Sequence, residues 1–66
     1  MFGKKVKELR IEKNISQSAL AKALNIDRTT VMKWETEGRE TSFEMLCKVA
    51  DFFGVTTDYL LGRTDF

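Results

Sequence analysis

The stretch that most constrains the fold of this chain runs from Ser16 to Glu35 and reads SQSALAKALNIDRTTVMKWE. Its apolar residues recur at the three- and four-residue spacing of an α-helix, in two short runs separated only by the residues LNID. Ser16 and Asp27 are residue types that cap helix N-termini, and Asn25 tolerates the left-handed backbone that ends a helix. Because the connection is so short, we predict two helices that cross at about 90–120°.

The rest of the chain carries the same helical pattern, and no segment alternates between apolar and polar residues with a period of two. The predicted elements outside this stretch are a helix over residues 4–13 ended by Asn14, a loop over 36–41, a helix capped by Thr41 or Ser42 and ended by Gly54, and a short helix from Thr56 or Thr57 to Gly62. We therefore predict an all-α fold, with five short helices in one globule and a single domain over residues 1–66.

The apolar side chains on the inner faces of these helices are expected to form one small core. Trp34 could instead stack on a nucleic-acid base, but it shares a face with Val31, which favours a core position. Met32 could face either DNA or solvent. The expected core residues are Val6, Leu9, Leu20, Ala21, Leu24, Ile26, Val31, Trp34, Phe43, Leu46, Val49, Ala50, Phe53, Leu60 and Leu61.

The composition weighs against catalysis. The chain has 66 residues with one cysteine and no histidine, so it cannot form an internal disulfide and lacks the residues of Ser/His, Cys/His and zinc sites. A domain this small also has little room to enclose a substrate. We expect no enzyme activity, no metal and no cofactor, and we expect Cys47 to be an inert thiol and not a redox switch.

The hydropathy pattern and the cysteine count indicate in which cellular compartment the chain is found. No apolar run approaches the roughly 18 residues that indicate a membrane-spanning helix. A lone cysteine suits a reducing environment. We therefore expect a cytoplasmic protein that has no membrane partner.

The net charge of +1 conceals an uneven distribution. Residues 4–13 carry five basic and two acidic side chains, whereas residues 41–66 carry two basic and four acidic ones. Such polarity would turn the N-terminal third toward an anionic partner. An ordinary solvated surface is the alternative, and the charge pattern by itself leaves it open.

The outer face of the second helix in the stretch carries Arg28, Thr29 and Lys33. Arginine and lysine can donate hydrogen bonds to guanine, and threonine can contact a donor, an acceptor or the methyl group of thymine. We therefore interpret these three side chains as candidates for contacts with base edges.

The same stretch, together with VADFFGVTTDYLLG near the C-terminus, resembles the phage Cro/CI repressor family, also called the Xre-type regulators. The resemblance covers nearly the whole chain. It implies a helix-turn-helix at about residues 16–35, whose second helix enters the major groove of double-stranded DNA. By position, it implies base contacts from Arg28, Thr29 and Lys33, phosphate contacts from Gln17, Thr30, Arg39 and Ser42, and an internal ion pair between Arg10 and Glu35.

These observations lead us to expect a sequence-specific transcriptional regulator, a repressor that binds a near-palindromic operator as a homodimer. A short terminal helix cannot bury all of its large side chains, so the candidates for the dimer interface are Tyr59, Leu60, Leu61 and Phe66. In the family, a segment like DYLLGRTDF often leads into a second domain. The chain could therefore be a complete regulator or the N-terminal part of a longer one.

The alternative hypothesis is a protein-interaction module or an antitoxin built on the same scaffold. The near-neutral charge supports it, as do Glu37 and Glu40 in the predicted loop. DNA is instead favoured by the polar side chains that gather on one expected face, Gln17, Arg28, Thr29 and Lys33.

Overall fold

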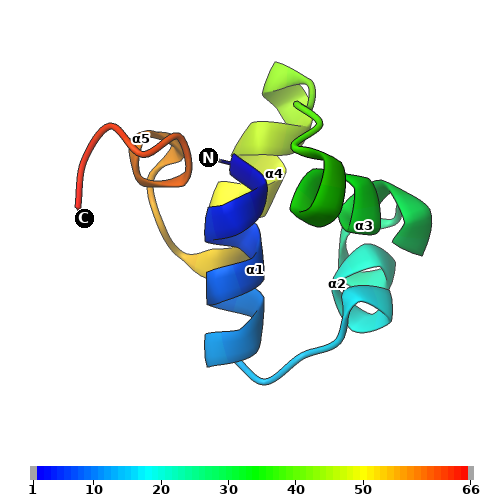
Figure 1. Ribbon diagram of the computed structural model, residues 1–66. Coiled ribbons are helices and arrows are strands. Elements are labelled where there is room, and N and C mark those ends of the chain that lie inside the picture. The colour runs from blue at the N-terminus through cyan, green and yellow to red at the C-terminus, as the bar shows by residue number, and fades with distance from the viewer. Residues whose placement is uncertain (1, 66) are drawn as a thin grey trace.

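The computed structural model describes residues 2–65, and this part of the chain contains helices and no strand. The predicted all-α class with five short helices is therefore confirmed (Figure 1). In chain order the helices are α1 (Phe2–Glu12), α2 (Gln17–Leu24), α3 (Arg28–Glu37), α4 (Phe43–Phe53) and α5 (Thr57–Leu60).

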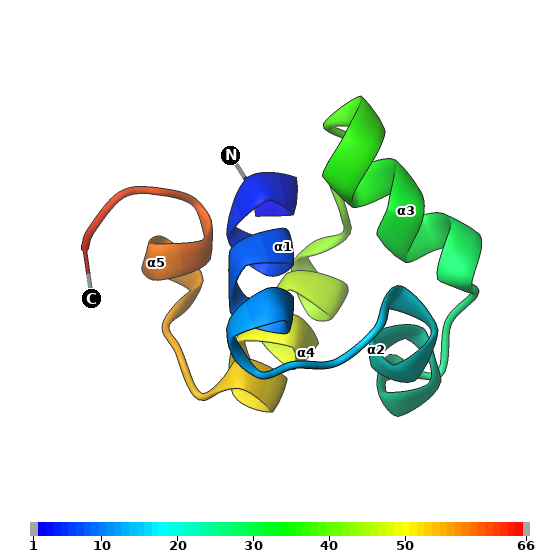
Figure 2. The same cartoon turned by 60° about the horizontal axis from the view of Figure 1, so that its bottom comes forward.

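The first helix is the centre of the arrangement. In both views α1 lies between α3 on one side and α5 on the other (Figures 1 and 2), and it contacts both of them. The α2 helix packs against α3, and α4 packs against α5. Both α3 and α5 are thus packed against α1.

The helix ends follow the capping rules that the sequence suggested. Ser16, Ser42 and Thr56 each accept a hydrogen bond from the backbone N–H three residues ahead, at 3.0, 3.1 and 3.0 Å. Asn25 ends α2 in the left-handed conformation, at φ 60°. Asp27 occupies the predicted cap position of α3, but its carboxylate makes no capping hydrogen bond.

Two helices are longer than predicted. The α1 helix begins at Phe2, two residues before the predicted start, because the Phe2 ring is buried and packs edge-on against Trp34, with ring centroids 5.1 Å apart. The α3 helix continues to Glu37, so Thr36 is helical and its hydroxyl donates to the Met32 carbonyl at 2.8 Å. The predicted loop over 36–41 is therefore reduced to residues 38–42.

The core contains most of the expected residues, and Trp34 is among them with 2% of its surface exposed. Two predictions are wrong. Phe43 is 77% exposed because it is the first residue of α4 and lies beyond the packed part of that helix. Leu61 is 42% exposed because α5 ends at Leu60, so the apolar stripe does not continue onto it.

Gly3 marks a close approach between α1 and α3. A Cβ atom at this position would lie 1.7 Å from the carbonyl oxygen of Trp34, which no side chain can tolerate. The contact is formed between distant parts of the chain, and sequence reasoning did not identify it. Within residues 2–65, no helix combines the length and the apolar character needed to cross a membrane.

Candidate nucleic-acid interface

An ion pair joins α1 to α3. The Nε atom of Arg10 donates to Oε2 of Glu35 at 2.9 Å, and Nη2 donates to Oε1 at 3.0 Å. The two side chains are 13% and 1% exposed. Hydrogen bonding to Glu35 raises the pKa of the Arg10 guanidinium despite the opposing effect of burial. Arg10 thus makes the internal contact that the resemblance implied.

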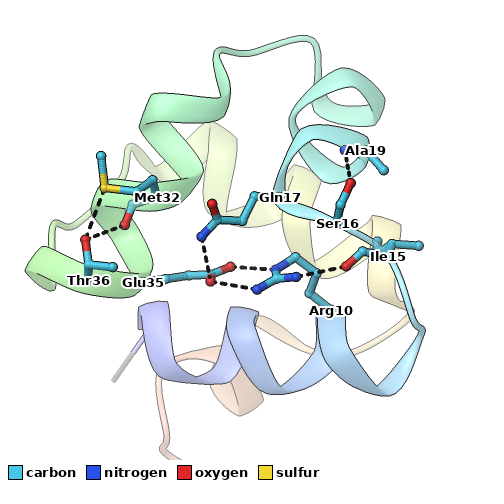
Figure 3. A network of polar contacts seen from close by, with 8 residues as sticks. All are labelled: Arg10, Ile15, Ser16, Gln17, Ala19, Met32, Glu35 and Thr36. Atoms are coloured by element: carbon cyan, nitrogen blue, oxygen red, sulfur yellow. Dashed lines mark hydrogen bonds and ion pairs between the residues drawn. The ribbon is translucent and has the colours of Figure 1, made fainter.

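Gln17 joins the same group from α2. Its Nε2 atom donates to Oε1 of Glu35 at 3.1 Å, while Nη1 of Arg10 donates to the carbonyl of Ile15 at 2.9 Å (Figure 3). Three helices therefore meet at one carboxylate. Sequence reasoning expected Gln17 at a phosphate and did not predict its bond to Glu35, because no local signal connects two residues 18 positions apart.

The outer face of α3 carries the predicted base-contacting residues. Arg28 and Thr29 are exposed, and Lys33 is half-buried one turn beyond Thr29. Within the part of the chain that the structure describes, these three side chains form no hydrogen bond or ion pair. Their donors are therefore available to a ligand. Met32 is half-buried, and its carbonyl and sulfur both accept the Thr36 hydroxyl.

A shallow hollow connects α3 to the α3–α4 loop. Its volume is about 260 Å³, and it is lined by Thr30, Lys33, Trp34, Arg39 and Glu40. The fold thereby brings together two residues that the sequence assigned to phosphate, Thr30 and Arg39, with one assigned to a base, Lys33.

Arg39, in the α3–α4 loop, pairs with the last residue of α3. The Nε atom of Arg39 lies 3.4 Å from Oε1 of Glu37, and the two side chains are 63% and 45% exposed. Both groups are therefore well solvated, and such a pair holds Arg39 only weakly.

Gln17 and Ser42 each occupy the beginning of a helix. Ser42 Oγ accepts from the Met45 backbone N–H at 3.1 Å, so its own hydroxyl hydrogen is not used in that bond. Gln17 is the first residue of α2. Helix N-termini present free backbone N–H groups and a partial positive charge, which suits them to phosphate.

The predicted dimer-interface residues differ in exposure. Leu60 is fully buried in the core, so the prediction that it lies at a dimer interface is wrong. Tyr59 is half-buried, with Nζ of Lys5 4.7 Å from its ring centroid. Leu61 is exposed and lines a hollow of about 430 Å³ together with Phe2. Phe66 lies outside the described residues.

The remaining sequence expectations concern metals and the lone thiol. In residues 2–65, no group of three or more His, Cys, Asp or Glu side chains could hold a metal ion. Cys47 is a free, half-buried thiol on α4.

Several known proteins are similar to this chain in sequence. The transcriptional activator BcrR of Enterococcus faecalis is 40% identical over 60 residues, which cover 91% of this chain and 29% of that protein. The transcriptional regulator ImmR of Bacillus subtilis is 33% identical over 64 residues, 97% of this chain and 50% of ImmR. The phage CTXphi repressor RstR of Vibrio cholerae is 29% identical over 65 residues, 98% of this chain and 59% of RstR.

These relatives are longer proteins, of which the chain spans between 29% and 59%. No solved structure is significantly similar to the chain. The HTH_3 family, described as helix-turn-helix, matches residues 6–60, which include all of α2 and α3. The chain therefore belongs to the helix-turn-helix family of phage Cro/CI (Xre) type.

Proposed function

We propose that this chain binds double-stranded DNA and regulates transcription, with α3 inserted in the major groove. The observation that carries the proposal is the unpaired outer face of α3, where Arg28, Thr29 and Lys33 have no partner among the described residues. Polar side chains of these types can read base edges. Binding, and not catalysis, is the function of this surface.

The proposed contacts to the DNA backbone come from α3 and from the segments that flank it, the beginning of α2 and the α3–α4 loop. Gln17 begins α2, and Ser42 caps α4, so each can donate to a phosphate beside a helix N-terminus. Thr30 and Arg39 face the hollow between α3 and the loop, next to Lys33. Phosphate contacts at these positions would set the register in which α3 reads the bases.

We further propose that the chain acts as a repressor and binds a near-palindromic operator as a homodimer. A single domain of this size offers few contacts, whereas two-fold pairing doubles them and sets the recognition helices about 34–36 Å apart. The exposed Leu61 supports a pairing surface at this end of the molecule, beside a hollow that extends from Leu61 and Phe2 to Arg39 in the α3–α4 loop. Tyr59 flanks it on α5.

A protein-interaction module or antitoxin is the second candidate function. The observation that favours it is the carboxylate of Glu37, 3.4 Å from Nε of Arg39, because this negative charge lowers the positive potential that the loop offers to phosphate. A partner protein would then replace DNA as the main ligand.

Titration against a random-sequence duplex at increasing salt separates the two functions. For a DNA-binding chain, the logarithm of affinity should fall with the logarithm of salt concentration, with a slope of about −0.9 per phosphate neutralised. For variants that remove a cation from the outer face of α3, such as Arg28→Ala, the control for general loss of positive charge is Lys48→Ala. Lys48 lies on α4, beside the C-terminal end of α2. Affinity that does not depend on salt would contradict DNA binding and favour the protein partner.

A further inference from the structure

The side-chain amide of Gln17 has a defined orientation. Its nitrogen donates to Oε1 of Glu35 at 3.1 Å. The reverse orientation would set the amide oxygen against a carboxylate oxygen, and neither atom could donate. Glu35 therefore selects the orientation in which the nitrogen points inward, and the second hydrogen on that nitrogen is left for another acceptor.

A carboxylate beside a phosphate site would ordinarily repel DNA. The side chain of Glu35 is only 1% exposed, so water does little to screen its charge. Arg10 compensates for this charge with two short hydrogen bonds, one to each carboxylate oxygen. A phosphate that approaches Gln17 consequently meets a neutral pair and not an isolated anion.

Arg10 also holds the chain segment that leads into α2. Its third hydrogen bond, from Nη1, ends on the carbonyl of Ile15 at 2.9 Å. Ile15 directly precedes Ser16, the N-cap of α2. One guanidinium thus restrains the beginning of α2 against both α1 and α3 (Figure 3).

From this geometry we propose that Arg10 and Glu35 are positioning residues for DNA binding, which orient the Gln17 amide so that its free N–H donates to a backbone phosphate. The inference rests on the proposed DNA-binding function. It assigns to the ion pair a role in affinity that is separate from its role in stability, because the pair acts through a residue that itself touches DNA.

A double-mutant cycle in DNA binding tests this coupling. The paired replacement Arg10→Met with Glu35→Leu removes both charges at similar volume, a change that folded proteins often tolerate. In the unmodified chain, Gln17→Ala should weaken binding to a random-sequence duplex roughly tenfold, the effect of one hydrogen bond to a charged group. In the paired background, the same substitution should cost less than about twofold, because Gln17 is no longer oriented.

Arg28→Ala is the control, since Arg28 makes no contact with Arg10, Gln17 or Glu35. This substitution should lower the affinity for duplex by the same factor in both backgrounds. Thermal unfolding establishes that each variant is folded. Should the paired variant be unfolded, Arg10→Lys provides a second background, which keeps a cation beside Glu35 but loses the bidentate bond, and the cost of Gln17→Ala should also fall there.

The outcomes distinguish this inference from the function on which it rests. If Gln17→Ala costs the same factor in every folded background, the positioning role is overturned while DNA binding stands. If the unmodified chain shows no salt-dependent affinity for duplex, DNA binding and the positioning role fail together.

Discussion

The side chains on the two sides of α3 differ in burial and in bonding. The inner side carries Trp34, which is buried in the core, and Glu35, whose side chain is buried and bonded to Arg10 of α1. The outer side carries Arg28 and Thr29, which are exposed and unpaired among the described residues. The inner side therefore stabilises the fold, whereas the proposed base contacts lie on the outer side, so substitutions on the outer side should change DNA binding with little effect on stability.

The two Arg–Glu pairs near α3 repeat this contrast. Arg10 and Glu35 form a bidentate pair of which the carboxylate is 1% exposed, whereas Arg39 and Glu37 share one contact at 3.4 Å with both side chains well exposed. The chemistry is the same in both pairs, and burial decides how much each pair contributes.

The largest expected effect is that of Glu35→Ala. It leaves the Arg10 guanidinium buried without its counter-ion, so the free energy of unfolding should fall by about 3–5 kcal/mol. Denaturant titration followed by circular dichroism measures the loss. A loss below about 1 kcal/mol would show that water reaches Arg10 and that the inner side of α3 is less firmly held than its burial indicates.

Gly3→Ala should rank second, because the added methyl group would collide with the Trp34 carbonyl and push α1 away from α3. We expect a loss of about 1–3 kcal/mol in the free energy of unfolding, as for other overpacked sites. Gly54→Ala is a useful comparison, since a Cβ atom there meets no neighbouring atom and its cost comes from the positive φ of 69° alone. Equal losses would contradict the proposed close contact.

Arg28→Ala should leave stability nearly unchanged and alter recognition. On an operator selected from random duplexes, we expect a loss of about 1–3 kcal/mol in binding free energy and a relaxed preference at one base pair. Gln17→Ala should weaken every duplex alike. An equal loss on all sequences for Arg28→Ala would mean that Arg28 contacts phosphate and not a base.

Glu37→Ala should have the smallest effect on stability, within about 0.5 kcal/mol, because its pair with Arg39 is solvated. Removing this acidic group should slightly strengthen binding to duplex at low salt, since Arg39 is then free for phosphate. Weaker binding of the variant would indicate that Glu37 holds Arg39 in a productive position.

Local signals accounted for most of the fold. The cap Ser16 and the left-handed Asn25 were recognisable because capping depends on a few neighbouring residues, and Ser42 and Thr56 were each one of two candidate caps. Errors occurred at helix ends, as with Phe43 and Leu61, where the apolar pattern continues but the packed neighbours do not. Periodicity describes which face a residue occupies and not whether another element covers it.

The candidate site divides in the same way. The outer face of α3 follows from residue type and helical spacing, so Arg28, Thr29 and Lys33 could be selected from the sequence. The hydrogen bond from Gln17 to Glu35 could not be predicted from the sequence, because it requires α1, α2 and α3 to meet at one carboxylate.

What the sequence by itself determined is the helical class, the helix-turn-helix and the polar character of the outer face of α3, because these depend on short-range spacing and capping. Only the tertiary structure decided which charges are neutralised, which leucine is buried and how closely α1 approaches α3 at Gly3. The physical reason is that burial and pairing are set by contacts between residues far apart in the chain, where spacing along the sequence carries no information about distance.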